Sequence, residues 1–209
     1  ARRMDRLEKL AEQIGGTAHQ LDVTSQDSVD KLAASVGRID LLVNNAGGAI
    51  GLESIAESSL EDWDRMYEIN VAGTARVTKA FLPSLLASTD NAAGDNAGLV
   101  VNIGSVAGWT PYAGGAGYNA AKHGVRAFNR VLRLENPGTL RVTEIDPGRV
   151  ATEEFSLNRF RGDAEKAAEV YADKLNLSAE DIAEAVRWVA ALPAHMNIDT
   201  MQITPRDQV

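Results

Sequence analysis

The chain contains no cysteine among its 209 residues, and this absence limits its chemistry. It excludes disulfide bonds, thiolate nucleophiles and metal sites that use cysteine ligands. The sequence also has no block of Lys and Arg, and its formal net charge is −8. An acidic balance without a basic cluster argues against nucleic acid as a main partner. We expect no metal site in this chain.

Long hydrophobic runs are missing as well. None approaches the ~18 residues that a membrane span requires. The polar start, Ala1-Arg2-Arg3, is unlike a signal peptide. We therefore expect a cytoplasmic protein without a membrane partner. The length, with 44% hydrophobic and 24% charged residues, is typical of one globular domain, which we place over residues 1–209.

The most informative stretch that is present runs from Ser105 to Lys122. Tyr118 and Lys122 are four positions apart, so a helix here would put both side chains on one face. A phenol normally titrates near ~10, and a neighbouring ammonium stabilises the phenolate and lowers that pKa. The pair is therefore suited to exchanging a proton with an alcohol or a carbonyl.

Ser105 ends an apolar run, residues 98–105, that is typical of a buried strand. The carboxyl end of a strand in an open α/β sheet faces the crevice in which ligands bind. We therefore expect the Ser105 hydroxyl to hold the oxygen of a substrate next to the Tyr118 phenol.

These residues resemble the short-chain dehydrogenase/reductase family, whose Ser and Tyr-x-x-x-Lys signature has the same spacing as Ser105, Tyr118 and Lys122. Three further motifs of the family stand in the right order: Asn44-Asn45-Ala46-Gly47, the single Asn70, and the segment at residues 147–152. The resemblance covers essentially the whole chain. It implies an α/β fold, a doubly wound parallel sheet of the Rossmann type, and reversible hydride transfer between a nicotinamide and a small alcohol or carbonyl.

The resemblance also implies roles for individual residues. Tyr118 would be the general acid and base, and Lys122 would lower the pKa of Tyr118 and hold the nicotinamide ribose. Ser105 would orient the substrate oxygen. Asn70 would bend its helix and bind a water that leads protons from Lys122 to solvent; the alternative is a surface Asn.

Further residues match the positions at which the family binds its cofactor. Asp22 and Val23 would contact the adenine; the alternative for Asp22 is an ordinary turn residue or a helix cap. The remaining positions let the backbone approach the nucleotide or meet the nicotinamide carboxamide: Asn44, Ala46, Gly47, Pro147, Gly148, Val150 and Thr152.

The family's glycine-rich phosphate loop is not found in this sequence. It belongs to a first βαβ unit that would precede the helix predicted at residues 4–14. We expect that roughly ~40 residues, the size of such a unit with its leading strand, are missing from the chain. Arg2 and Arg3 would then end its second strand and favour the 2′-phosphate of NADP over NAD. The alternative is that both are solvated charges.

The periodicity and the capping signals define the remaining elements. Helices are predicted at residues 4–14, 26–36, 59–85, 118–136 and 178–192, and strands at 17–24, 39–43, 98–105, 140–145 and 196–203. A surface loop without assigned function occupies residues 87–97, and residues 153–174 match the family's substrate lid. His123 and His195 are expected to be structural. Trp109 and Tyr112 either line a pocket or pack under the loop, and Arg149 faces a ligand or solvent.

Residues 141–160 and 192–199 look most like a bacterial branch that acts on small 3-hydroxy acids and hydroxy amino acids such as serine. The resemblance further implies a homodimer or a homotetramer. A rival reading is a non-catalytic nucleotide-sensing or regulatory protein on the same fold. The intact Ser105, Tyr118 and Lys122 argue against it. A hydrolase is a weaker rival, because the chain lacks a Gly-x-Ser-x-Gly elbow and a plausible catalytic His.

Overall fold

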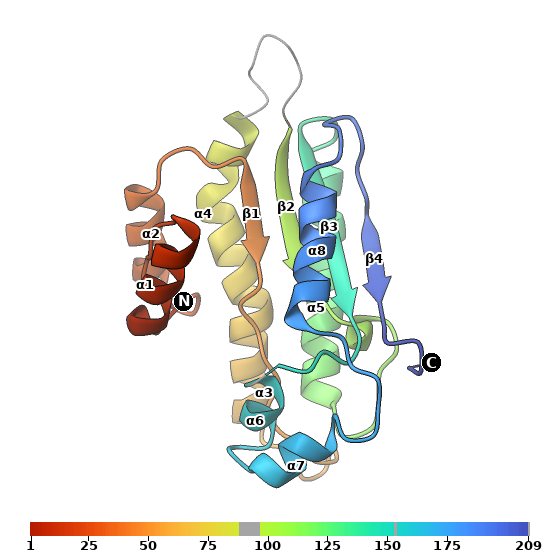
Figure 1. Cartoon of the computed structure of the whole chain (residues 1–209). Coiled ribbons are helices and arrows are strands. Elements are labelled where there is room, and N and C mark those ends of the chain that lie inside the picture. The colour runs from red at the N-terminus through yellow and green to blue at the C-terminus, as the bar shows by residue number, and fades with distance from the viewer. Residues whose placement is uncertain (88–96, 153, 209) are drawn as a thin grey trace.

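A computed structural model describes residues 1–87, 97–152 and 154–208, so most of the loop predicted at 87–97 lies outside the described residues. The described sheet has four parallel strands in the order β1-β2-β3-β4. Their bounds are Leu41–Asn44, Gly98–Ile103, Leu140–Pro147 and Thr200–Ile203. The arrowheads in Figure 1 all point toward the end of the molecule at which α6 and α7 lie. The predicted α/β class with a parallel sheet is confirmed.

Helices cover both faces of this sheet. On one face, α4 (Gly73–Ala87) and α5 (Ala116–Glu135) enclose a core that includes Leu85, Val100 and Val142. On the other, α8 (Ala179–Ala190) packs Val189 against Val101 and Ile145. Alternate residues of β2 and β3 therefore enter different cores. For this reason β3 is buried almost throughout, as is typical of a parallel strand.

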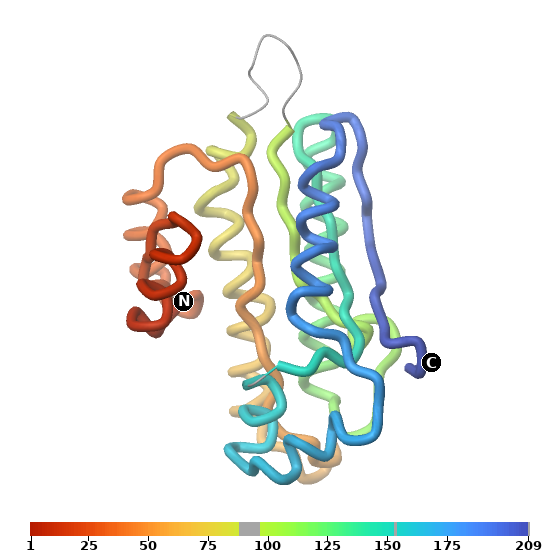
Figure 2. The backbone as a smooth tube through the Cα atoms, in the orientation of Figure 1, coloured from red at the N-terminus to blue at the C-terminus, as the bar shows by residue number. Residues whose placement is uncertain are grey.

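The edge strand β1 is less buried than predicted. Leu41 and Val43 are each 39% exposed, because they face away from α4 and no described helix covers that side. Beside α4 lie α1 (Met4–Ile14) and α2 (Gln26–Ser35), as Figure 2 shows in red and orange. The strand predicted at residues 17–24 is wrong. A strand needs a ladder partner, and here the Leu21 N–H donates instead to the Ala1 carbonyl.

The capping signals are confirmed. Ser25, Ser59 and Ser178 each accept a hydrogen bond from a backbone N–H in the first turn of α2, α3 (Leu60–Tyr67) and α8. The helix predicted at 59–85 is interrupted, however. Between α3 and α4 the chain forms a π-helical segment, η1 (Glu68–Ala72), and α-helical geometry resumes at Gly73. Such a bulge is frequent at functional sites.

The short elements gather at the carboxyl end of the sheet. They are η2 (Val106–Gly108), α6 (Phe155–Arg159) and α7 (Ala164–Glu169). The last strand, β4, is shorter than predicted, because pairing with β3 begins only at Thr200. None of the described helices is both long enough and apolar enough to cross a membrane.

Buried amides join the sheet to α4 and α5. The Asn44 amide donates to Thr78 Oγ1 at 2.9 Å and to Asn102 Oδ1 at 2.8 Å. The Asn102 amide in turn donates to Asn129 Oδ1 at 2.8 Å. These bonds cross the strand pair directly below the carboxyl end of the sheet. They bear out the prediction that Asn44 ties neighbouring strands.

Asn102→Ala should lower the free energy of unfolding by about 2–4 kcal/mol, since it leaves buried groups of Asn44 and Asn129 without partners. Urea denaturation measures this difference. Asn158→Ala is the matched control, because Asn158 is exposed and makes no described side-chain hydrogen bond. Equal loss of stability in both variants would contradict the structural role of the network.

Candidate active site

Tyr118 and Lys122 lie one turn apart on α5, as predicted, and both side chains are buried. The Lys122 ammonium is 5.7 Å from the centroid of the Tyr118 ring and donates to the Ile103 carbonyl at 2.9 Å. Ser105 follows β2 directly, and its hydroxyl caps η2 while hydrogen-bonding with the Tyr118 phenol. The structure therefore brings these three predicted residues together at the carboxyl end of β2.

Burial dominates the electrostatics of this pair. It raises the pKa of Tyr118 to about 12, and the hydrogen bond with Ser105 acts in the opposite direction. It also lowers the pKa of Lys122 to about 8, partly offset by the charges of Asp146 and Glu144. We predicted that Lys122 would lower the pKa of Tyr118, but the pKa is raised. Removing the phenolate from water destabilises it more than the neighbouring groups stabilise it.

Asn70 occupies the middle of η1 and is buried. Its amide donates to the carbonyls of Met66, at 2.7 Å, and Gly48, at 2.9 Å, while Oδ1 accepts from the Gly48 N–H at 3.2 Å. Asn70 thus joins the π-helical segment to the loop after β1, which excludes the surface alternative. A Cβ on Gly47 would lie 2.6 Å from Asn70 Oδ1, so this loop approaches Asn70 closely. The predicted water of a proton relay stays a prediction.

The other cofactor positions divide into two groups. Gly47, Pro147, Gly148, Val150 and Thr152 line one large cavity together with Ser105, Tyr118 and Lys122. Asn44, Ala46, Asp22 and Val23 do not line it. Asn44 turns into the core, and Asp22 Oδ1 accepts from the backbone and hydroxyl of Thr24, at 3.0 and 2.7 Å, which is the turn role left open above. The Val23 carbonyl accepts from Arg76 at 2.6 Å.

The two N-terminal Arg residues differ in their contacts. Both are exposed. Arg3 forms two hydrogen bonds to the Glu154 carboxylate, at 2.5 and 2.7 Å, which Arg6 also contacts at 2.8 Å. Glu154 lines the large cavity. Arg3 thus forms a surface ion pair with a residue of the cavity, and its side chain remains 54% exposed; both the 2′-phosphate role and the alternative of a solvated charge stay open.

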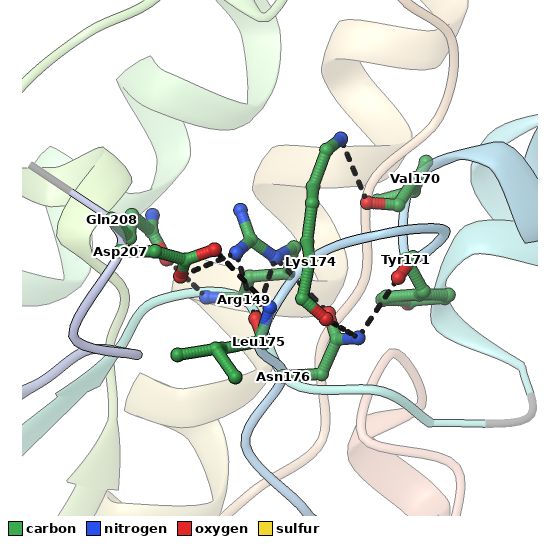
Figure 3. Close-up of polar contacts among 8 residues, drawn as sticks. All are labelled: Arg149, Val170, Tyr171, Lys174, Leu175, Asn176, Asp207 and Gln208. Carbon is green, nitrogen blue, oxygen red and sulfur yellow. Dashed lines mark hydrogen bonds and ion pairs between the residues drawn. The ribbon is translucent and has the colours of Figure 1, made fainter.

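The charged group of Arg149 is engaged by neighbouring residues (Figure 3), and its side chain is 17% exposed. Its guanidinium donates to the Leu175 carbonyl, to Asn176 Oδ1 and, at 2.8 Å, to Asp207. Its backbone N–H donates to Gln208 at 2.7 Å. Arg149 therefore fastens the segment after β3 to the loop before α8 and to the C-terminal residues, three segments that meet beside the cavity.

A buried pair of carboxyls lies behind the site and was missed from the sequence. Glu144 and Asp146 are two positions apart on β3, and a Cβ on Gly104 would collide with both. Asp146 accepts from the Ser105 N–H at 2.9 Å and from Trp109 Nε1 at 2.6 Å. The carboxyl oxygens of Glu144 have no hydrogen-bond partner, and burial, followed by the charge of Asp146, raises the pKa of Glu144 to about 8. Two acids in one buried strand were the signal that could have revealed it.

The aromatic loop residues have separate roles. Trp109 packs under the loop against Asp146 and Arg126, whereas Tyr112 lines the cavity. His123 Nδ1 lies 2.8 Å from the Asn119 carbonyl, as befits the structural role that was predicted. Arg159, at the end of α6, also lines the cavity beside Tyr118 and was not singled out from the sequence. Its place depends on how the lid folds over α5.

The cavity measures about 1110 Å³. Among the residues that the structure describes, its lining holds four cationic residues, Lys122, Arg149, Arg159 and Lys174, against one acidic residue, Glu154. In a chain of net charge −8 this is a local reversal of sign. The volume and the charge suit a ligand the size of a dinucleotide with phosphate groups. The described residues contain no cluster of His, Asp and Glu that could hold a metal ion.

Comparison with known proteins agrees with this geometry. The sequence model of the short chain dehydrogenase family matches residues 1–159. The chain belongs to this family. It is 42% identical to the NADP-dependent 3-hydroxy acid dehydrogenase YdfG of Shigella flexneri, over 99% of this chain and 84% of that protein. It is 51% identical to an uncharacterized oxidoreductase of Mycobacterium tuberculosis, over 100% of this chain and 80% of the relative.

Solved structures of the family give the same picture. A closed form of serine dehydrogenase complexed with NADP⁺ superposes with a TM-score of 0.93 at 42% identity, covering 100% of this chain and 84% of that one. An alcohol dehydrogenase from the archaeon Thermococcus sibiricus, complexed with 5-hydroxy-NADP, gives 0.82 at 30% identity, with coverage of 100% and 85%.

The buried acid pair makes stability depend on pH. Burial, followed by the charge of Asp146, raises the pKa of Glu144 from 4.5 to about 8. As the pH rises, Glu144 loses its proton in the unfolded chain near pH 4.5 but in the folded protein only near pH 8. Between these pH values the contribution of Glu144 to the free energy of unfolding therefore falls. Glu144→Gln cannot titrate, so it removes this decrease in stability with rising pH. Its free energy of unfolding should therefore rise relative to the unsubstituted protein as the pH increases from roughly 5 to 8.

Urea denaturation at a series of pH values measures the difference. Glu144→Leu is the matched control, because it also lacks the titration but cannot donate to Asp146. It should show the same pH trend at lower absolute stability. Stability curves that run parallel for all three proteins would contradict the assignment of the proton to Glu144.

Proposed function

We propose that this protein is an NADP-dependent oxidoreductase that transfers a hydride between the nicotinamide and a small alcohol or carbonyl. The observation that carries the proposal is the joint placement of Ser105, Tyr118 and Lys122 at the mouth of a cationic cavity. A purely nucleotide-sensing protein would gain nothing from a buried phenol and a buried ammonium, each of which costs desolvation free energy. The non-catalytic alternative is therefore not favoured.

Each residue of the site has a chemical task in this proposal. Tyr118 moves a proton to or from the substrate oxygen, and Ser105, already bonded to the phenol, orients that oxygen. Lys122 supplies a positive charge that stabilises the phenolate as it forms. Asn70 positions the loop at Gly48 that borders the site. The nicotinamide, when bound, supplies the hydride acceptor or donor.

The cavity residues fit the cofactor. Lys122 would hold its ribose, the backbone at Gly47 and Gly148 would border it, and Val150 and Thr152 would meet its carboxamide. Arg2 and Arg3 would bind the 2′-phosphate that distinguishes NADP from NAD. Adenine contacts at Asp22 and Val23, and nucleotide contacts at Asn44, Ala46 and Pro147, stay predictions.

The relatives suggest the substrate class. One relative is named a 3-hydroxy acid dehydrogenase and another a serine dehydrogenase, which indicates small 3-hydroxy acids or hydroxy amino acids as substrates. The single domain over residues 1–209, the homodimeric or homotetrameric state and the cytoplasmic location stay predictions.

Tyr118→Phe should reduce turnover by about 10³-fold or more, because the site loses its proton donor and acceptor. NADPH affinity should stay within about threefold, since the ring itself remains. The measurement is NADP⁺ reduction with a 3-hydroxy acid, together with NADPH fluorescence titration. Tyr67→Phe is the control, because Tyr67 is exposed on α3. Turnover by Tyr118→Phe close to that of the control would refute the assigned role.

Replacing both Arg2 and Arg3 with Ala should weaken NADPH binding by about 10- to 100-fold, the range expected for losing a charged hydrogen bond. NADH affinity should change little, because NADH has no 2′-phosphate. Titration of both nucleotides measures the difference. Arg38→Ala provides the control, because Arg38 pairs with Asp40. Parallel loss of NADPH and NADH affinity would exclude 2′-phosphate recognition by this pair.

A further inference from the structure

Arg159 places a guanidinium next to the proposed catalytic phenol. It is the last residue of α6, and its guanidinium carbon lies 5.3 Å from the centroid of the Tyr118 ring. The rings of Tyr112 and Phe155 are at similar distances, 5.4 and 5.5 Å. Three aromatic rings thus surround one cation inside the cavity. Cation–π contacts stabilise a guanidinium there without neutralising its charge.

The donors of Arg159 are not all used. Among the described residues no carboxylate lies within ion-pair distance of it, and its Nε is buried without a hydrogen-bond partner. Nη2 donates to the Tyr112 hydroxyl. By contrast Arg161, two positions later, pairs with Asp62 at 2.8 Å and with Glu53 at 3.5 Å. A buried donor that is left without an acceptor is costly, and such a group is a natural place for a ligand.

The other cations of the cavity are less suited to this task. The Arg149 guanidinium is occupied by Leu175, Asn176 and Asp207, and Lys174 donates to the Val170 carbonyl at 3.1 Å (Figure 3). Lys122 is bonded to Ile103 on the other side of the Tyr118 site. Among the described lining cations, Arg159 is therefore the one that combines an unused donor, Nε, with a guanidinium beside the Tyr118 ring.

We propose that Arg159 binds the carboxylate of the substrate and so selects small hydroxy acids over uncharged alcohols. A guanidinium presents a planar fork of donors that matches a carboxylate. With the substrate hydroxyl between Ser105 and Tyr118, a carboxylate a few bonds away on the same molecule reaches Arg159. The aromatic walls restrict the carbon chain between the two groups to a short one. This inference rests on the proposed function and adds the residue that sets its substrate class.

The test compares 3-hydroxybutanoate with its uncharged isostere, 3-hydroxybutanamide, under NADP⁺ reduction. Arg159→Met should lower kcat/KM for the acid by about 10- to 100-fold, chiefly through KM, as expected for losing a charge-assisted hydrogen bond. The value for the amide should change by less than about threefold. Arg159→Lys keeps the charge but loses the fork, so it should recover part of the activity toward the acid. Arg38→Met is the matched control.

A second measurement does not depend on turnover of an acid. Butanoate, which has the carboxylate but no hydroxyl, should inhibit oxidation of the amide competitively in the unsubstituted protein. That inhibition should weaken by a similar factor in Arg159→Met. NADPH titration of each variant shows that the cofactor site remains intact.

The outcomes separate the two proposals. Turnover of both substrates by the unsubstituted protein, with equal loss in Arg159→Met, would overturn the carboxylate role of Arg159 and leave the proposed function standing. Butanoate inhibition that is unchanged in Arg159→Met would also overturn the carboxylate role and leave the proposed function standing. Turnover of neither substrate by the unsubstituted protein would overturn the proposed function and the substrate class together.

Discussion

The close approach of α5 to the carboxyl ends of β2 and β3 is the constraint on which the rest of the structure depends. A Cβ on Gly108 would lie 2.9 Å from the Lys122 carbonyl, and one on Gly104 would collide with the Glu144 and Asp146 carboxyls. Only glycine permits these contacts. They bring the Tyr118 face of the helix against Ser105 and bury a phenol, an ammonium and two acids within one polar pocket.

Burying so many polar groups requires partners for most of them. Asp146 accepts from the Ser105 N–H and from Trp109, and the Lys122 ammonium donates to the Ile103 carbonyl; Glu144, which has no such partner, is the group whose pKa burial raises to about 8. Below them the amides of Asn44, Asn102 and Asn129 continue the network into the sheet. Because these groups are preorganised, the reorganisation free energy of the site is small when charge develops on the substrate oxygen.

Helix α6 completes the site from the other side. α6 places Phe155 and Arg159 against the Tyr118 ring, while Arg149 fastens the segment after β3 to the loop before α8 and to the C-terminal residues. Helix α5 and the turn after β2 therefore hold the proposed proton-transfer residues, and a shorter element later in the chain, α6, places the Arg159 charge beside them. This division is common in α/β enzymes, in which loops vary on a fixed scaffold.

The sequence by itself determined the features that depend on local spacing: the shared face of Tyr118 and Lys122, the helix caps, the parallel strands and the order of the family's motifs. Only the tertiary structure decided features that depend on distant neighbours. It turned Asn44 inward, left residues 17–24 without a strand partner, exposed Leu41 and Val43, and raised the pKa of Tyr118. Helix periodicity and capping act within a few residues, whereas burial, pairing and charge depend on segments that meet only in the fold.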